Sequence, residues 1–424
     1  MSFSSTHADR INEVLKSSTQ DPHKGIPRVV LLVASSESPL IFSSSAGYAQ
    51  LPDYPATQED LDKAEKITPD SVFELWSCTK LVTSIATLQL IEKGQIGLDD
   101  DVTKYLPEVR DAKKYKGLDK DDKALTEELK TTPTIRMLLS HTAGLTYELT
   151  PAHAEAQKAL GLPNVYSRAS SKESLLAMPF IYRAVPFNYS EPGTVWSYGT
   201  AIDYLALTIE AVTGGSLIDY FKKNVFGPLG ISDMSYAPPS NRINMAYDDP
   251  ANPSAPWKAG PGSTLKENRG GAGLFGSPAS YLKIVRTLLG DGQPLFQKTE
   301  TVEKMFEDQT AGSERFQTSM NQFMALGSDP FFGEAEQAGH GLGGALTGAR
   351  HGGGRSKGTL SWSGYCNTFW VADRNQGVAY VFFTNSTPTF AHPRIFGLWE
   401  KIEKDIFDGA LQGRRSGSRR QTTL

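Results

Sequence analysis

Cysteine is scarce in this chain, and its scarcity limits the chemistry. Only two of the 424 residues are cysteines, Cys78 and Cys366. Two cysteines cannot form the disulfide framework of a small secreted domain, and no Cys or His residues stand at the spacing of a zinc site. The sequence therefore predicts a metal-free protein that requires no cofactor.

A charge excess and a long apolar run are also missing. The 43 Lys and Arg residues nearly balance the 47 Asp and Glu residues, and no internal basic stripe favours nucleic-acid binding. No apolar run approaches the ~20 residues of a membrane-spanning helix, and the opening MSFSSTHADR lacks the apolar centre of a secretory signal. We therefore expect a soluble, cytoplasmic protein without a membrane span.

The patterns that are present place strands near both ends of the chain. Alternating or continuous apolar runs predict strands over 28–35, 40–48, 357–362, 367–374 and 378–385. Helical spacing is found over 8–17 and 394–407, and the intervening chain is mainly helical. The sequence predicts an α/β (α+β) fold, with an antiparallel sheet built from both termini and flanked by helices.

This distribution also predicts how the chain divides into domains. Residues 1–76 and 338–408 would form a discontinuous sheet domain, and residues 77–337 a large inserted, mainly helical region. The tail, residues 409–424, contains the polar and basic segment RRSGSRRQTTL. Because such a segment offers little apolar surface to bury, we expect this tail to be disordered.

Ser77 and Lys80 form a Ser-x-x-Lys pair at the start of a predicted helix with one buried face. Residues three apart are neighbours on a helix, so the Lys80 ammonium can reach the Ser77 hydroxyl. Free N–H groups at a helix start also favour developing negative charge. The pair suits a serine nucleophile with a lysine partner, although a helix cap beside a solvated lysine would produce the same pattern.

The Ser-x-x-Lys pattern occurs three times, and its context separates the copies. Ser263 and Lys266 lie in a loop rich in Gly and Pro, where no helix holds the lysine. Ser280 and Lys283 lie inside a predicted helix whose apolar face leaves Lys283 in solvent. Ser77 is therefore the favoured copy.

Further segments follow in a characteristic order, namely LLSHTAGL (138–145), PGTVWSYGTAIDYLALTIEAVTGGSL (192–217), GPLGISDM (227–234), GGAGLFGSPASYLKIVRTLL (270–289) and KGTLSWSGYCNTFWVADR (357–374). With the Ser77 motif, they resemble the serine β-lactamase-related superfamily, which has the class C β-lactamase and penicillin-binding-protein fold. The resemblance covers about Pro27 to Phe407. WSYGTAIDY and KGTLSWSGYCN are most similar to fungal polyketide acyltransferases of the lovastatin side-chain acyltransferase type, and then to bacterial carboxylesterases. A β-lactamase/transpeptidase-like fold is implied.

The resemblance implies roles for three side chains: Ser77 is the acylated nucleophile, Lys80 is its partner, and Tyr198 is the general acid/base. Unperturbed tyrosine and lysine are both protonated at neutral pH. The base is therefore either a Tyr198 phenolate stabilised by Lys80 or a neutral Lys80, and the sequence leaves this open. The backbone N–H groups of Ser77 and Tyr365 would form the oxyanion hole.

Two departures from the superfamily pattern argue against β-lactam hydrolysis. Tyr198-Gly199-Thr200 lacks the Asn of the usual Tyr-x-Asn motif, and Trp362-Ser363-Gly364 replaces Lys-Thr-Gly. An indole does not bind a β-lactam carboxylate as a lysine does, and it leaves an apolar wall. The residues expected to bind substrate are Trp362, Ser363, Gly364 and Tyr147.

Two histidines are interpreted as structural. His141 ends an apolar helix, where a histidine commonly satisfies backbone carbonyls, and Ser77 already has two candidate bases. His340 belongs to the glycine-rich run 339–354, which lacks the strand-to-helix context of a phosphate loop. We interpret that run as a hairpin edge near the site.

The predicted function is that of a serine acyltransferase, which moves an acyl group through acyl-Ser77 to an alcohol of a hydrophobic natural product. The donor would be a thioester or ester, small or carrier-bound, which makes an acyl-carrier protein a candidate partner. The alternative is a carboxylesterase that gives the acyl group to water. A catalytically silent binding protein on the same scaffold is a third hypothesis, and the intact Ser77, Lys80 and Tyr198 set argues against it.

Overall fold

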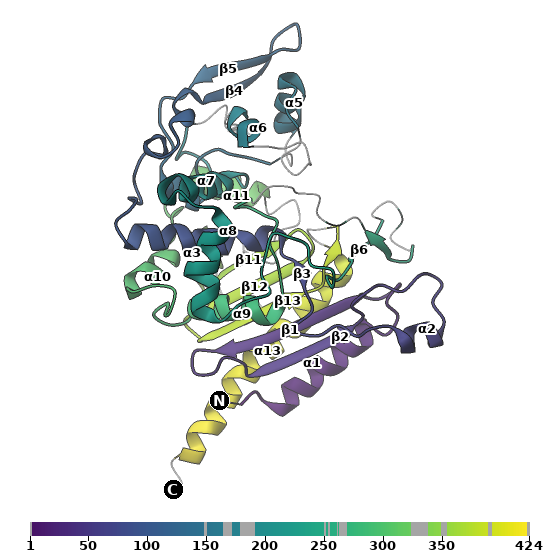
Figure 1. Ribbon diagram of the computed structural model, residues 1–424. Helices are drawn as coiled ribbons and strands as arrows, with labels where there is room; N and C mark the ends of the chain where they lie inside the picture. Colours follow the sequence, from purple (N-terminus) through teal and green to yellow (C-terminus); the bar gives the residue numbers. More distant parts are fainter. Residues whose placement is uncertain are drawn as a thin grey trace.

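In the computed structural model, a seven-stranded antiparallel sheet joins the two ends of the chain (Figure 1). The strand order is β2-β1-β13-β12-β11-β10-β9, so the N-terminal β1 pairs with the C-terminal β13. The structure describes residues 2–147, 151–163, 172–178, 191–249, 252, 255–260, 262, 269–323, 338–348, 354–388 and 392–421. The predicted sheet built from both termini is confirmed.

The strands of this sheet are β1 (Arg28–Ser35), β2 (Phe42–Gly47), β9 (Gly339–His340), β10 (Ala345–Leu346), β11 (Leu360–Gly364), β12 (Thr368–Asp373) and β13 (Val378–Phe383). β11 begins and ends later than the predicted strand over 357–362, so Trp362-Ser363-Gly364 lies inside it. β9 and β10 pair antiparallel, which is the hairpin edge expected for the glycine-rich run. Ser263 and Lys266, and the part of that run over 349–353, lie outside the described residues.

Helices cover both faces of the sheet. α1 (Ser5–Ser18) and α13 (Pro393–Gln421) pack together on one face, and α9 (Pro278–Thr287) packs on the other. Successive side chains of a strand point to opposite faces, and β13 illustrates this. The Phe382 ring lies 5.7 Å from Phe369 on the α13 side, whereas the Phe383 ring lies 5.7 Å from Tyr281 of α9.

The predicted disorder of residues 409–424 is wrong for residues 409–413, because α13 continues through them. The N-terminal residues cover this part of the helix. The Ser4 N–H donates to the Gly409 carbonyl at 3.0 Å, and a Cβ at Gly413 would lie 1.5 Å from the Ser2 carbonyl oxygen. The contact is long-range, so composition of the tail alone could not indicate it.

The chain between the sheet strands is mainly helical, as predicted. Its helices are α2 (Gln58–Lys63), α3 (Thr79–Glu92), α4 (Ile135–Leu139), α5 (Pro151–Leu160), α6 (Lys172–Ala177), α7 (Ala201–Thr213), α8 (Leu217–Phe221), α9, α10 (Thr299–Met305) and α11 (Glu314–Phe323). Its short strands are β3 (Phe73–Glu74), β4 (Lys113–Leu118), β5 (Ala124–Glu128), β6 (Met245–Tyr247), β7 (Lys258–Gly260) and β8 (Phe275–Gly276), with β14 (Ser386–Thr387) pairing to β6. One cluster of buried apolar side chains continues from the sheet into this region, and the domain boundaries stay a prediction.

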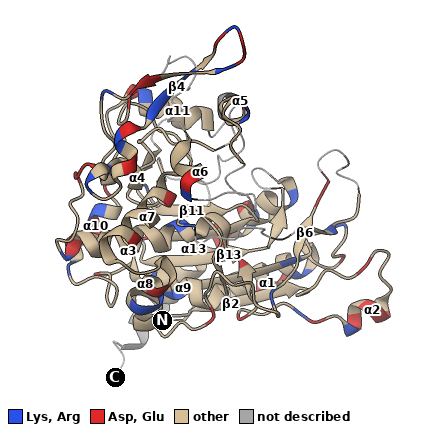
Figure 2. Cartoon of the chain, turned by 45° about the horizontal axis from the view of Figure 1, so that its top comes forward, with Lys and Arg blue, Asp and Glu red and all other residues tan. Residues whose placement is uncertain are grey.

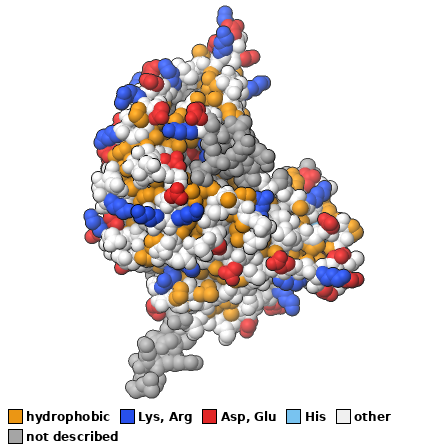
Figure 3. Space-filling model, in the orientation of Figure 1, with side chains coloured by type: hydrophobic (Ala, Val, Ile, Leu, Met, Phe, Trp, Pro, Cys, Tyr) orange, Lys and Arg blue, Asp and Glu red, His pale blue; other side chains and the backbone are white. Residues whose placement is uncertain are grey.

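Basic residues (Lys and Arg) and acidic residues (Asp and Glu) are interspersed along the outer elements (Figure 2). In the space-filling view, charges of both signs lie at the end of the molecule formed by the β4–β5 hairpin (Figure 3), whose exposed charged residues include Lys113 and Glu128. Among the described residues, no single helix is long and apolar enough to cross a membrane. One bent pair, Ala201–Thr213 with Leu217–Leu229, meets the length and composition criteria together across an 82° bend.

Candidate active site

Ser77 lies in a short 3₁₀ turn, Trp76–Cys78, between β3 and α3. Trp76 has a positive φ of 45°, a conformation that costs a non-glycine residue free energy and persists only where surrounding contacts hold it. Its indole Nε1 donates to Glu74 Oε2 at 3.1 Å. The turn brings the Ser77 hydroxyl directly to the start of α3.

α3 is buried on all sides over Thr79–Leu90, which corrects the expectation of a single buried face. It packs against α7 and α8, so the helix lies at the centre of the inserted region rather than on its surface. Lys80 is consequently only 2% exposed. The hypothesis of a helix cap beside a solvated lysine is therefore wrong.

The Lys80 ammonium has three hydrogen-bond partners. Nζ lies 3.1 Å from Ser77 Oγ, 2.9 Å from the Tyr147 hydroxyl oxygen and 2.8 Å from the Gly271 carbonyl oxygen. An ammonium has three N–H donors, and these three acceptors can use all of them. The predicted proximity of Lys80 to Ser77 is observed, and Tyr147, expected to bind substrate, lies beside Lys80.

Tyr198 reaches Ser77 from the segment before α7. Its hydroxyl donates to Ser77 Oγ at 2.7 Å and accepts from the Trp362 indole Nε1 at 3.2 Å. The neighbouring residue must be glycine, because a Cβ at Gly199 would lie 1.8 Å from the Leu145 carbonyl oxygen. Trp362, predicted as an apolar wall, therefore also supplies a polar N–H to the tyrosine.

The Gly270-Gly271 segment lies between α3 and α7 and forms hydrogen bonds with both helices. The Thr83 hydroxyl of α3 donates to the Gly270 carbonyl at 2.8 Å, next to the Lys80 bond to Gly271. From α7, the Asp203 carboxylate accepts the Gly271 N–H at 3.1 Å and lies 3.8 Å from Arg269 in a buried ion pair. The sequence comparison includes this segment among the superfamily motifs but assigns no role to Gly270-Gly271, although the Gly-Gly pair in GGAGLFGSP was the available signal.

The candidate oxyanion residue Tyr365 directly follows β11. Its ring lies 5.1 Å from that of Trp76, and its side chain is half exposed. Gly364 packs against the Ser77 turn so closely that a Cβ there would lie 2.3 Å from the Leu75 carbonyl oxygen. Ser363, the remaining predicted substrate residue, is mostly buried in β11 opposite Phe369.

His141 and His340 are buried beside Tyr198 in a cluster of aromatic rings. The His141 ring lies 5.0 Å from Tyr198 and 5.5 Å from His340. Burial lowers the pKa of His141 well below 6.5 and that of His340 to about 4, so both are neutral at pH 7. The His141 carbonyl accepts the Ser197 N–H at 2.7 Å, a backbone contact that does not involve the imidazole, so the structural role of the His141 side chain stays a prediction.

The third Ser-x-x-Lys copy does not form a comparable site. The Ser280 hydroxyl donates to Asp233 at 2.5 Å, and Lys283 Nζ lies 3.3 Å from the Gly230 carbonyl oxygen on the exposed side of α9.

In the part of the chain that the structure describes, no group of three or more His, Cys, Asp or Glu side chains is arranged to hold a metal ion.

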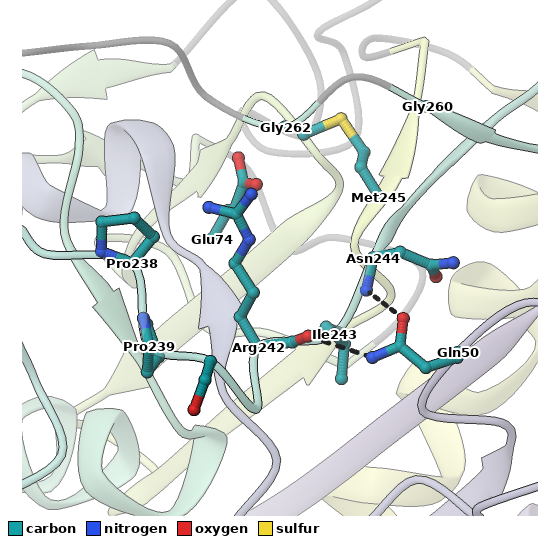
Figure 4. A pocket seen from close by; sticks show the side chains of 11 residues that line it. Gln50, Glu74, Pro238, Pro239, Arg242, Ile243, Asn244, Met245, Gly260 and Gly262 are labelled. Carbon is teal, nitrogen blue, oxygen red and sulfur yellow. Dashed lines mark hydrogen bonds between the residues drawn. The ribbon is translucent and has the colours of Figure 1, made fainter.

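A cavity of about 590 Å³ lies beside the Ser77 turn (Figure 4). Glu74, which holds the Trp76 indole, lines it together with Arg242, and both side chains point toward Gly262. A Cβ at Gly262 would lie 2.5 Å from Glu74 Oε1 and 3.5 Å from Arg242 Nη2. Gln50 binds the backbone of two other lining residues: its side chain accepts the Asn244 N–H at 3.1 Å and donates to the Arg242 carbonyl at 3.0 Å.

Known proteins are similar to this chain over most of its length. The chain is 32% identical to a lovastatin esterase of Penicillium rubens, over 74% of this chain and 79% of that protein. It is 29% identical to the monacolin J acid methylbutanoyltransferase of Aspergillus terreus, over 83% and 86% of the two chains. A variant of simvastatin synthase from Aspergillus terreus superimposes with a TM-score of 0.81 at 26% identity, covering 96% of each chain.

The fold is thus the predicted β-lactamase/transpeptidase-like fold. The family model described as Beta-lactamase matches residues 15–399, nearly the whole chain, and on that match the chain belongs to the beta-lactamase family.

Proposed function

We propose that this protein is a serine acyltransferase that moves an acyl group from a thioester or ester donor, through acyl-Ser77, to an alcohol of a hydrophobic natural product. The observation that carries the proposal is the convergence of Lys80 Nζ, at 3.1 Å, and the Tyr198 hydroxyl, at 2.7 Å, on Ser77 Oγ. A serine hydroxyl needs a base at this range to become nucleophilic.

In the acylation step, Tyr198 acts as a phenolate after its hydroxyl proton has passed to solvent. Ser77 Oγ attacks the donor carbonyl carbon, and the Ser77 proton passes to the Tyr198 phenolate oxygen. The Lys80 ammonium, 4.9 Å from the Tyr198 ring centroid, and the Trp362 indole N–H both stabilise negative charge on that oxygen. This arrangement favours Tyr198 over Lys80 as the base. Tyr198 then returns the proton to the leaving thiolate or alkoxide as the C–S or C–O bond breaks.

In the transfer step, the acceptor alcohol loses its proton to Tyr198 and attacks the acyl-Ser77 carbonyl carbon. The tetrahedral intermediate collapses when Ser77 Oγ leaves and regains a proton from Tyr198. In both steps, the N–H groups of Ser77 and Tyr365 would stabilise the oxyanion, a contribution of roughly 3 to 4 kcal/mol.

The apolar surroundings favour an alcohol over water as acceptor. Trp362, Phe323 and Trp196 form a ring cluster around Tyr198, and apolar surface gains about 25 cal/mol for each Å² it buries. A relative that is named a methylbutanoyltransferase supports transfer, and one that is named a lovastatin esterase supports the second candidate, ester hydrolysis by the same residues.

The test is intact-mass spectrometry after incubation with small acyl thioesters, a carrier-bound acyl thioester and p-nitrophenyl esters. We expect a mass gain of one acyl group that Ser77→Ala abolishes and Ser280→Ala retains, because only Ser77 lies against Lys80 and Tyr198. Acylation of Ser77→Ala would refute the assignment. If free acid is the sole product when hydrophobic alcohols are present, the protein is an esterase and the proposal of acyl transfer is wrong.

A further inference from the structure

The only two cysteines of the chain each follow one of the two candidate oxyanion residues. Cys78 comes directly after Ser77, and Cys366 comes directly after Tyr365. Both side chains are completely buried. The two segments that carry them are far apart in sequence, but β11 and β12 pack against the Trp76–Cys78 turn.

The two thiols make reciprocal contacts across this junction. Cys366 Sγ lies 2.8 Å from the Glu74 carbonyl oxygen, on the chain entering the Ser77 turn. Cys78 Sγ lies 3.3 Å from the Thr368 carbonyl oxygen, on the chain leaving Tyr365. Each cysteine therefore binds the backbone of the segment that carries the other.

The backbone around both cysteines is anchored as well. The Tyr281 hydroxyl donates to the Cys78 carbonyl at 2.8 Å, and the Ser386 N–H donates to the Cys366 carbonyl at 2.9 Å. Gly364 leaves no room for a side chain between the segments, because its Cβ would lie 2.3 Å from the Leu75 carbonyl oxygen. The separation of the two segments is thus defined by direct backbone contact and by the thiols.

Both thiols keep their protons at neutral pH. Burial raises the pKa of Cys78 to about 12 and that of Cys366 well above its usual 9. A protonated thiol can donate a hydrogen bond but is a poor nucleophile and metal ligand. The chemistry of this pair is therefore hydrogen bonding and not thiolate reactivity.

We propose that Cys78 and Cys366 are positioning residues that hold the Ser77 N–H and the Tyr365 N–H at the separation required to bind one oxyanion. The inference rests on the proposed function, which supplies that oxyanion. Donors to an oxyanion act only within a narrow range of distance, so even a small shift between the two segments lowers transition-state stabilisation more than substrate binding.

The experiment compares Cys366→Ala, Cys78→Ala and the corresponding serine variants in the full chain. The first two readouts are kcat and KM for a p-nitrophenyl ester, with the concentration of active sites determined by titration with a fluorophosphonate. The third readout is Ki for an arylboronic acid that forms a tetrahedral adduct on Ser77. For the alanine variants we expect kcat to fall and Ki to rise by about tenfold while KM stays within about twofold. Serine retains a donor, so the serine variants recover most of the loss.

Thr287→Ala is the matched control, because it removes another buried side chain that donates to a backbone carbonyl, that of Ile284 at 2.8 Å. Wild-type kcat and Ki in folded Cys366→Ala and Cys78→Ala would overturn the inference, and so would serine variants as impaired as the alanine variants. Failure of the proposed function is distinguishable, because the wild-type enzyme itself would then gain no acyl group on Ser77.

Discussion

The hydroxyl of Tyr198 touches both Ser77 Oγ and the Trp362 indole, so one oxygen atom connects the nucleophile candidate to the β11 strand. Removing that atom leaves the ring and its packing in place. The consequences of its loss should therefore appear in proton transfer and hardly in folding.

We predict that Tyr198→Phe lowers kcat by ~10² to 10⁴-fold, the usual range for loss of a general acid/base, with a nearly unchanged melting temperature. Steady-state ester turnover and thermal unfolding measure the two effects. Tyr204→Phe is the matched control, since it removes another buried tyrosine hydroxyl, bonded to the Leu175 carbonyl at 3.1 Å. Wild-type turnover in Tyr198→Phe would assign the base role to Lys80.

Gly271 occupies the space between two side chains of the site. A Cβ there would lie 2.7 Å from Asp203 Oδ2 and 3.0 Å from the Tyr147 hydroxyl, and the Gly271 carbonyl holds Lys80. We predict that Gly271→Ala lowers kcat by at least ~10-fold and destabilises the fold by ~1 to 3 kcal/mol through overpacking.

The comparison for Gly271→Ala is Gly290→Ala, because a Cβ at Gly290 meets nothing within 4 Å. Ester turnover and urea unfolding should both stay near wild type in this control. If Gly271→Ala matched it, Lys80 would not depend on this backbone segment.

At the scale of elements, the sequence predicted what depends on local spacing. The strands near both termini and the Ser77–Lys80 neighbourhood follow from periodicities of two and 3.6 residues. The contacts of Lys80 with Tyr147 and Gly271 join residues 67 and 191 positions apart, and no local pattern encodes them. The complete burial of α3 was missed for the same reason, since α7 and α8 enclose it from distant parts of the chain.

The C-terminal helix offers a test of such a distant contact. Ala410 is completely buried, and Gly409 packs against Phe3, where a Cβ would lie 2.3 Å from the ring. We predict that a chain ending at Asp408 is less stable by roughly 1 to 3 kcal/mol than a chain ending at Gly413, because these contacts are lost.

Urea unfolding of the two truncated chains measures that difference. A matched substitution, Phe3→Ala, should destabilise the chain ending at Gly413 more than the chain ending at Asp408, because the contact with Gly409 is already absent from the shorter chain. Equal stability of the two truncated chains would restore the expectation that residues after 408 do not contribute to the fold.

At the scale of the whole molecule, the buried histidines make stability depend on pH. The pKa of His340 is lowered by burial from 6.5 to about 4, so the unfolded chain binds a proton at a higher pH than the folded one. The contribution of neutral His340 to the free energy of unfolding is therefore fully present above pH 6.5 and is lost as the pH falls toward 4. His340 alone contributes on the order of 3 kcal/mol to this loss.

The corresponding measurement is the free energy of unfolding of wild type and His340→Gln at several pH values between 7.5 and 4.5. We expect the variant to lose less stability than wild type over this interval, although His141, whose pKa is lowered in the same direction, still contributes. Identical pH dependence of the two proteins would show that His340 is not protonated on unfolding.

The pairing of β1 with β13 has a consequence for synthesis on the ribosome. β1 ends at Ser35 and β13 begins at Val378, so roughly 340 residues must be translated after β1 before its partner exists. At ~5 to 20 residues per second this takes about 20 to 70 s. During that time the β1–β2 hairpin presents an unpaired, strongly apolar strand edge. We therefore expect the nascent chain to need a chaperone that prevents aggregation through this edge until β13 has been synthesised.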